Sequence, residues 1–81
     1  MRPLRGDSVT RIFAARPHSL SSIRRFVTRS LGKAAQAERL AIATVEAVER
    51  RLPEFVRSAG AINVTIRFLP TAVEIDVLPF P

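Results

Sequence analysis

The sequence contains no cysteine and only one histidine, His18. Without cysteine the chain has no disulfide, no thiolate nucleophile and no cysteine zinc site, and one histidine leaves the usual metal clusters out of reach. Its three glycines are scattered and form no phosphate-binding loop. No run approaches the roughly 18 apolar residues that span a bilayer. We therefore expect no cofactor, no metal and no membrane-spanning helix, and we expect a cytoplasmic protein.

Length and composition limit the chain to one small domain. Its 81 residues, 47% of them hydrophobic, suffice for a single modest core. Pro3 and Gly6 discourage regular structure near the start. We expect residues 1–8 to form a flexible tail and residues 9–81 to form a single α+β domain.

Charge is distributed unevenly along the chain. Residues 1–33 hold seven arginines and Lys33 against Asp7, a balance of +7, whereas residues 34–81 hold five arginines against six acids, a balance of −1. A basic half favours an acidic partner, which can be a protein surface, nucleic acid or a membrane face. The same arginine- and serine-rich composition is also found in organellar transit peptides, although this segment carries helix and strand signals of its own.

Two helices are predicted in the middle of the chain. The first begins at Ser19 as its N-cap and ends at Gly32. Its apolar stripe consists of Leu20, Ile23, Val27 and Leu31, widened by Phe26. The second runs from about Ala34 and should kink or restart near Pro53 before ending by Gly60. Its buried stripe is predicted to contain Ala41, Val45, Val48, Leu52, Phe55 and Val56.

Strand signals precede and follow these helices. Residues 9–15 predict a strand, but their poor alternation leaves its inward face ambiguous. Residues 62–68 and 73–77 alternate clearly on either side of Pro70-Thr71, which predicts a β-hairpin with one buried face.

The hairpin turn also sets a register in which charge and apolar pairing agree. The predicted pairs are Phe68–Val73, Ile66–Ile75 and Arg67–Glu74. The element order is strand, helix, helix, strand, strand. We therefore predict an α+β, two-layer fold with two helices on one face of a small antiparallel sheet.

No arrangement of side chains points to catalysis. His18 beside Ser19 is the one candidate for a base and nucleophile, and a solvated histidine next to a helix cap is the simpler interpretation. Glu46 and Glu49 can share a helix face, where ordinary charge pairing with Arg50 is expected.

A basic ridge is predicted on the first helix. Arg25, Arg29 and Lys33 follow one another at intervals of four residues, with Arg24 beside them. Such a ridge can contact phosphates, which leaves a basic accessory protein bound to nucleic acid as an alternative function. The chain has no tyrosine or tryptophan for base stacking, however, and a solvated helix face is the simpler interpretation.

The segment 13–27, with the patterns Ala-x-Pro-x-x-Leu and Ile-Arg-x-Phe, resembles the opening of bacterial anti-sigma-factor serine kinases. These kinases belong to the GHKL (histidine-kinase-like) ATPase superfamily. Residues 42–48, Ile-Ala-Thr-Val-Glu-Ala-Val, resemble the nucleotide-site helix of that family, and the predicted hairpin resembles the strands before its glycine loop. The resemblance covers roughly residues 11–78 and implies a partial histidine-kinase-like ATPase fold.

The chain departs from the family pattern at the residues that bind nucleotide. Glu46 stands at the place of the catalytic glutamate, but Arg50 stands where an asparagine would hold magnesium, and a guanidinium cannot ligate a cation. Pro53 interrupts the site helix, and residues 77–81 fall where the glycine loop should begin. The resemblance therefore implies a truncated, degenerate relative that is not an enzyme and in which Glu46 is vestigial. A residual ATP-binding, serine-kinase-like enzyme is a further alternative.

The resemblance also implies protein partners. Members of this family commonly dimerise and bind sigma factors or anti-anti-sigma proteins, which suggests a non-catalytic interaction module in bacterial signalling or transcription control. A small sheet with unpaired edges also invites pairing with another chain. We expect a homodimer or a partner-bound protein that uses its first strand and first helix. The candidate partner-binding residues are Arg24, Arg25, Arg29, Lys33, Ile12 and Phe13.

Overall fold

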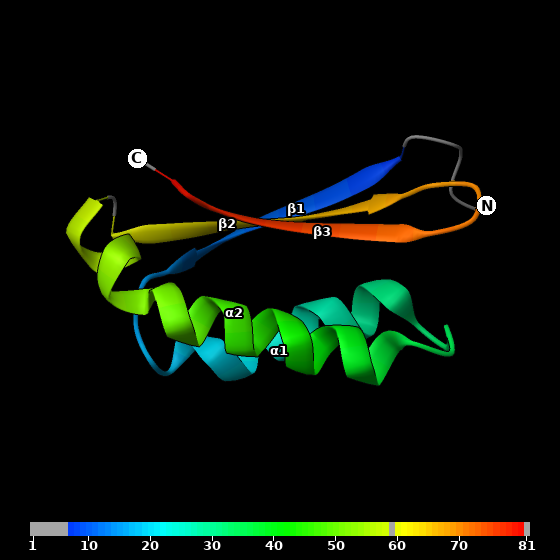
Figure 1. Ribbon diagram of the computed structural model, residues 1–81, viewed down its shortest axis with the longest axis horizontal. Helices are drawn as coiled ribbons and strands as arrows, with labels where there is room; N and C mark the ends of the chain where they lie inside the picture. The colour runs from blue at the N-terminus through cyan, green and yellow to red at the C-terminus, as the bar shows by residue number, and fades with distance from the viewer. Residues whose placement is uncertain (1–6, 59, 81) are drawn as a thin grey trace.

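A computed structural model describes residues 7–58 and 60–80, and its elements follow the predicted order (Figure 1). They are β1 (Ser8–Ala14), α1 (Ser19–Leu31), α2 (Ala37–Ser58), β2 (Ala61–Phe68) and β3 (Val73–Pro79). The strands form one antiparallel sheet in the order β1-β2-β3, and both helices lie on the same side of it. The predicted two-layer α+β class is confirmed.

β2 is the central strand; it pairs with β1 from Ala61 to Arg67 and with β3 from Ile62 to Phe68. The register of the hairpin is the predicted one, with the pairs Phe68–Val73, Ile66–Ile75 and Arg67–Glu74. β1 pairs on the other side of β2 and places Phe13 opposite Ile62. This pairing settles the inward face of β1, which the sequence left open.

The boundary predicted for the N-terminal tail was placed too late. Residues 1–6 of the predicted tail lie outside the described residues, but β1 already begins at Ser8, which pairs with Arg67. One residue earlier, the carbonyl of Asp7 accepts a hydrogen bond from the backbone N–H of Phe68 at 2.9 Å. Pairing with β2 therefore extends the strand beyond the limit that its own residues suggested.

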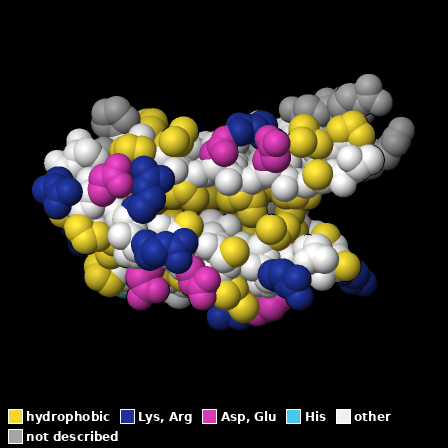
Figure 2. Space-filling model, in the orientation of Figure 1, with side chains coloured by type: hydrophobic (Ala, Val, Ile, Leu, Met, Phe, Trp, Pro, Cys, Tyr) yellow, Lys and Arg dark blue, Asp and Glu magenta, His cyan; other side chains and the backbone are white. Residues whose placement is uncertain are grey.

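The core lies between the sheet and the two helices. Ile62, Val64 and Ile66 of β2 alternate onto the helix side and are fully buried. The helices contribute Ile23, Val27, Leu31, Ala41, Val48 and Phe55. Several further hydrophobic residues are only partly buried, and Figure 2 shows hydrophobic side chains in an open hollow between the layers. The fully buried core is therefore small, and many of the hydrophobic side chains around it stay partly exposed.

The stripe predicted for α2 was wrong at one position and incomplete at another. Val56 is 55% exposed, whereas Thr44 is buried. The Thr44 hydroxyl donates a hydrogen bond to the carbonyl of Leu40 at 2.7 Å, so this polar group needs no other partner inside the core.

The ends of the helices also differ from the prediction. Ser19 is not the N-cap but the first residue of α1, and it is buried. Its backbone N–H already donates to the carbonyl of Arg16 at 3.0 Å, so the preceding turn replaces a side-chain cap. At the other end, Gly32 adopts a φ of 61° and stops the helix, as predicted.

Pro53 does not divide α2 into two helices. The helix continues as one element from Ala37 to Ser58, so no restart occurs. Figure 1 shows its last turns, in yellow-green, leaving the line of the preceding turns in the direction of the sheet. Gly60, with a φ of 75°, then donates its N–H to the carbonyl of Phe55 at 2.9 Å and closes this end.

A matched pair of valines on α2 tests this assignment of the core. Val48→Ala should lower the free energy of unfolding by about 2 kcal/mol, because two buried methyl groups are lost and a cavity remains. Val56→Ala, the same change at an exposed position of the same helix, should stay within about 0.5 kcal/mol of the wild type. Urea denaturation measures both values, and equal losses would contradict the assignment.

Candidate binding surfaces

The face of the sheet that points away from the helices carries no second layer in the described part of the chain. Strand register places alternate residues on this outer face. Ile12, Asn63 and Leu78 form one row across the three strands. The next row continues to Phe80, whose backbone N–H donates to the carbonyl of Ala61 at 3.0 Å. We call Ile12, Leu78 and Phe80 the outer apolar patch, since they are 41%, 56% and 43% exposed.

The other half of the outer face is polar. Arg67 forms ion pairs with Asp76 and, at 3.5 Å, with Glu74. Next to this group the Thr10 and Thr65 hydroxyls lie 2.9 Å apart. Figure 2 shows side chains of both charge signs gathered over the sheet layer. Among the described residues, the charges of the outer face are therefore one arginine and two acids, which nearly balance.

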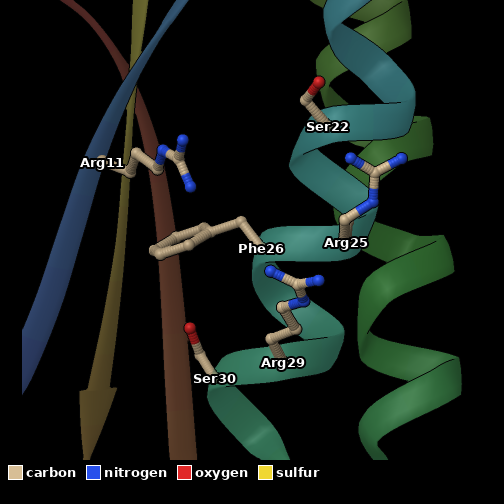
Figure 3. A pocket seen from close by; sticks show the side chains of 6 residues that line it. All are labelled: Arg11, Ser22, Arg25, Phe26, Arg29 and Ser30. Atoms are coloured by element: carbon tan, nitrogen blue, oxygen red, sulfur yellow. The ribbon is translucent and has the colours of Figure 1, made fainter.

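The basic ridge predicted on α1 is partly confirmed and gains a member from the sheet. Arg25 and Arg29 line a cavity of about 200 Å³ together with Arg11 of β1 (Figure 3). The remaining lining residues are Ser22, Phe26 and Ser30. We call this cavity the arginine pocket. Sequence reasoning missed Arg11, although its position two residues before Phe13 puts both on the helix side of β1.

Two members of the predicted ridge lie outside the arginine pocket. Arg24 forms an ion pair with Glu38 at the start of α2, and both line a neighbouring, more open cavity. Lys33 follows Gly32 beyond the end of α1, is exposed, and lines neither cavity. The helical spacing was correct, since Arg24 still lines the more open cavity together with Arg25 and Arg29, but its guanidinium is paired with a carboxylate from the second helix.

The two candidate residues on β1 lie on opposite faces of the sheet. Ile12 is exposed on the outer face, and its role in contacts stays a prediction. Phe13 is only 7% exposed and packs against Phe26, with ring centroids 5.8 Å apart. Its prediction as a contact residue was wrong, because consecutive strand residues point to opposite faces and Phe13 belongs to the core.

Glu46, the vestigial catalytic residue of the resemblance, lies on the exposed face of α2. It is two residues away from both Thr44 and Val48, which are buried, and therefore points to the opposite side of the helix. Arg50 is exposed one turn later. In residues 7–58 and 60–80, no group of three His, Asp or Glu side chains is placed to hold a metal ion, and neither helix is long and apolar enough to cross a membrane.

Arg51 links the helix layer to the sheet. Its guanidinium donates to the carbonyl of Val77 in β3 at 3.1 Å and lies 4.8 Å from the ring centroid of Phe55. The same group donates to both carboxylate oxygens of Glu54, at 3.1 and 3.2 Å. These hydrogen bonds lower the pKa of Glu54 and raise the pKa of Arg51. The sequence indicated only that this segment departs from the family pattern.

The lowered pKa of Glu54 predicts a pH effect of known sign. A carboxyl with a lower pKa in the folded state adds stability above its unfolded pKa of about 4.3, and this contribution disappears as the pH falls through the folded value. Between about pH 5 and about pH 3, the wild type should therefore lose more stability than Glu54→Gln. Urea denaturation across this range measures the difference. In an Arg51→Ala background the difference should shrink to the small part that the charge of Arg57 contributes, and a difference of unchanged size there would refute the assigned cause.

Comparisons with protein-family models, with curated proteins and with solved structures found no match to this chain. The similarity to GHKL kinases thus stays a prediction that depends on the residues quoted above.

Proposed function

We propose that this chain is a non-catalytic protein-interaction module that forms a homodimer through the outer face of its sheet. The observation that carries the proposal is the outer apolar patch of Ile12, Leu78 and Phe80. In residues 7–58 and 60–80 the strands carry helices on one side only, so these exposed apolar side chains gather on a face that this part of the chain leaves uncovered. Exposed apolar groups that cluster in this way are typical of interaction sites.

The distribution of charge favours a second copy as the occupant of this face. Two chains of net charge +6 repel each other in most orientations. The described charges of the outer face are only Arg67, Glu74 and Asp76, whereas the arginine pocket lies on the helix side. Two copies therefore repel each other least when their outer faces meet. In a dimer with a two-fold axis, the outer apolar patch of one copy contacts the outer apolar patch of the other.

The proposed dimer uses a different contact surface from the one expected from the sequence. The first strand still takes part through Ile12, but the basic residues of the first helix do not. Arg24, Arg25 and Arg29 lie where two copies would repel each other.

The size of the outer face sets the expected strength of the dimer. Three strands cover roughly 14 Å across the sheet and about 25 Å along it. This footprint is smaller than the ~800 Å² that each partner buries in a standard interface. We therefore expect a dimer that dissociates on dilution, in the manner of weak or transient complexes.

The non-catalytic part of the proposal is supported by the surroundings of Glu46. Its carboxylate lies on the exposed side of α2, with the guanidinium of Arg50 one turn away. A cationic neighbour competes with a metal ion for such a carboxylate. The resemblance to anti-sigma-factor kinases then suggests that binding of protein partners in signalling or transcription control is what this chain shares with that family.

Two equally exposed residues provide a matched test of the dimer. Leu78→Glu in the outer apolar patch should weaken dimerisation by about tenfold or more, because a carboxylate would be buried without a partner. Val56→Glu on α2 introduces the same charge at a side chain that is 55% exposed, against 56% for Leu78, and should leave the dimer unchanged. Sedimentation equilibrium over a range of concentrations measures both constants.

Either of two results would overturn this proposal. One is a wild-type chain that stays monomeric at the highest concentration tested. The other is a Leu78→Glu variant that dimerises as well as the wild type while circular dichroism shows it folded.

A further inference from the structure

The arginine pocket gathers three positive side chains from two elements that are far apart in the sequence. Arg11 extends from β1 toward α1, and Phe26 extends from α1 toward β1 (Figure 3). Arg25 and Arg29 come from successive turns of α1 and line the same cavity. The folded chain therefore holds like charges together, which costs free energy unless an anion is present.

The described structure provides no carboxylate for these three guanidinium groups. Arg24, Arg51 and Arg67 each form an ion pair with a glutamate or aspartate. No such pair is formed by Arg11, Arg25 or Arg29 in the described residues, and the segment between Asp7 and Glu38 contains no acid at all. Glu38 lines the more open cavity with Arg25 and Arg29, but its carboxylate is paired with Arg24.

The arrangement points to a ligand of defined chemistry. We propose that the arginine pocket binds the terminal phosphate of a small phosphate monoester. Planar guanidinium groups donate two parallel hydrogen bonds to phosphate oxygens, and a dianion neutralises more of the pocket's charge than a singly charged group. The hydroxyls of Ser22 and Ser30 provide further donors, and Phe26 provides an apolar wall for the group that carries the phosphate.

A nucleic-acid backbone suits this pocket less well. Each phosphodiester carries a single charge, and backbone binding normally combines a long basic track with aromatic rings for the bases. Among the described residues that line the pocket, Phe26 is the single aromatic one, and Lys33 lies away from the pocket. A short, recessed cluster of arginines is therefore better matched to one compact dianion.

The pocket and the proposed dimer surface are separable. Arg11 and Ile12 are neighbours in β1 but lie on opposite faces of the sheet. Loss of the dimer should leave the pocket intact, so the two proposals can fail independently.

The test is isothermal titration calorimetry of the full chain with phosphate, with pyrophosphate and with an oligonucleotide that has no terminal phosphate. Saturable binding of one anion per chain is expected. Arg11→Gln and Arg29→Gln should each weaken it by about tenfold, and Arg29→Lys, which keeps the charge but loses the planar fork, should weaken it less. Arg57→Gln, at the end of α2 and away from the pocket, removes the same charge and should leave the affinity unchanged.

Three outcomes would overturn the proposal. The first is the absence of saturable binding. The second is a loss of affinity in Arg57→Gln equal to that in the pocket variants, which would mean unspecific attraction to a basic chain. The third is tighter binding of an oligonucleotide without a terminal phosphate than of phosphate. Circular dichroism of each variant distinguishes a lost ligand contact from a lost fold.

Discussion

The alternation of side chains along β2 is the constraint on which the rest of the structure depends. Ile62, Val64 and Ile66 are fully buried under the helices, and β2 is hydrogen-bonded to a strand on each side. Every other element is positioned against this strand. Because the helices lie on one side only, the alternate residues Asn63 and Thr65 face a side that this part of the chain does not cover. This small two-layer domain thus builds its core on one face of its sheet, and the other face is the one that we propose makes the contacts between two copies.

The helix layer is held to the sheet by more than apolar contact. Arg51 places its guanidinium beside the ring of Phe55 and donates to the carbonyl of Val77, so one side chain spans α2 and β3. It does so two residues before Pro53, where the last turns of α2 bend toward the sheet. Arg51 and Pro53 belong to the segment that departs most from the nucleotide-site pattern of the GHKL kinases. In this chain the segment has a structural role, since it joins the helix layer to the sheet at the end of α2.

Features that depend on residues close together in the sequence could be predicted, whereas features that depend on residues far apart could not. The hairpin register follows from a short turn and from residues that alternate within a few positions of it, so pairs such as Arg67–Glu74 were predicted correctly. The inward face of β1 depends on its pairing with a strand about fifty residues later, and Phe13 was accordingly misplaced. The arginine pocket also depends on contact between elements that are far apart in the sequence. Helical spacing identified Arg25 and Arg29, whereas Arg11 joins them only when β1 is docked.

The register of β1 also connects the two proposed binding surfaces. A shift by one residue would exchange the sides of Arg11 and Ile12, placing a guanidinium on the outer apolar patch and an isoleucine in the arginine pocket. Burial of Phe13 on one face opposes such a shift, and the contact between the Thr10 and Thr65 hydroxyls opposes it on the other. The same interactions that fix this edge strand in the fold therefore also decide which side of the sheet carries the outer apolar patch and which side carries the arginine pocket.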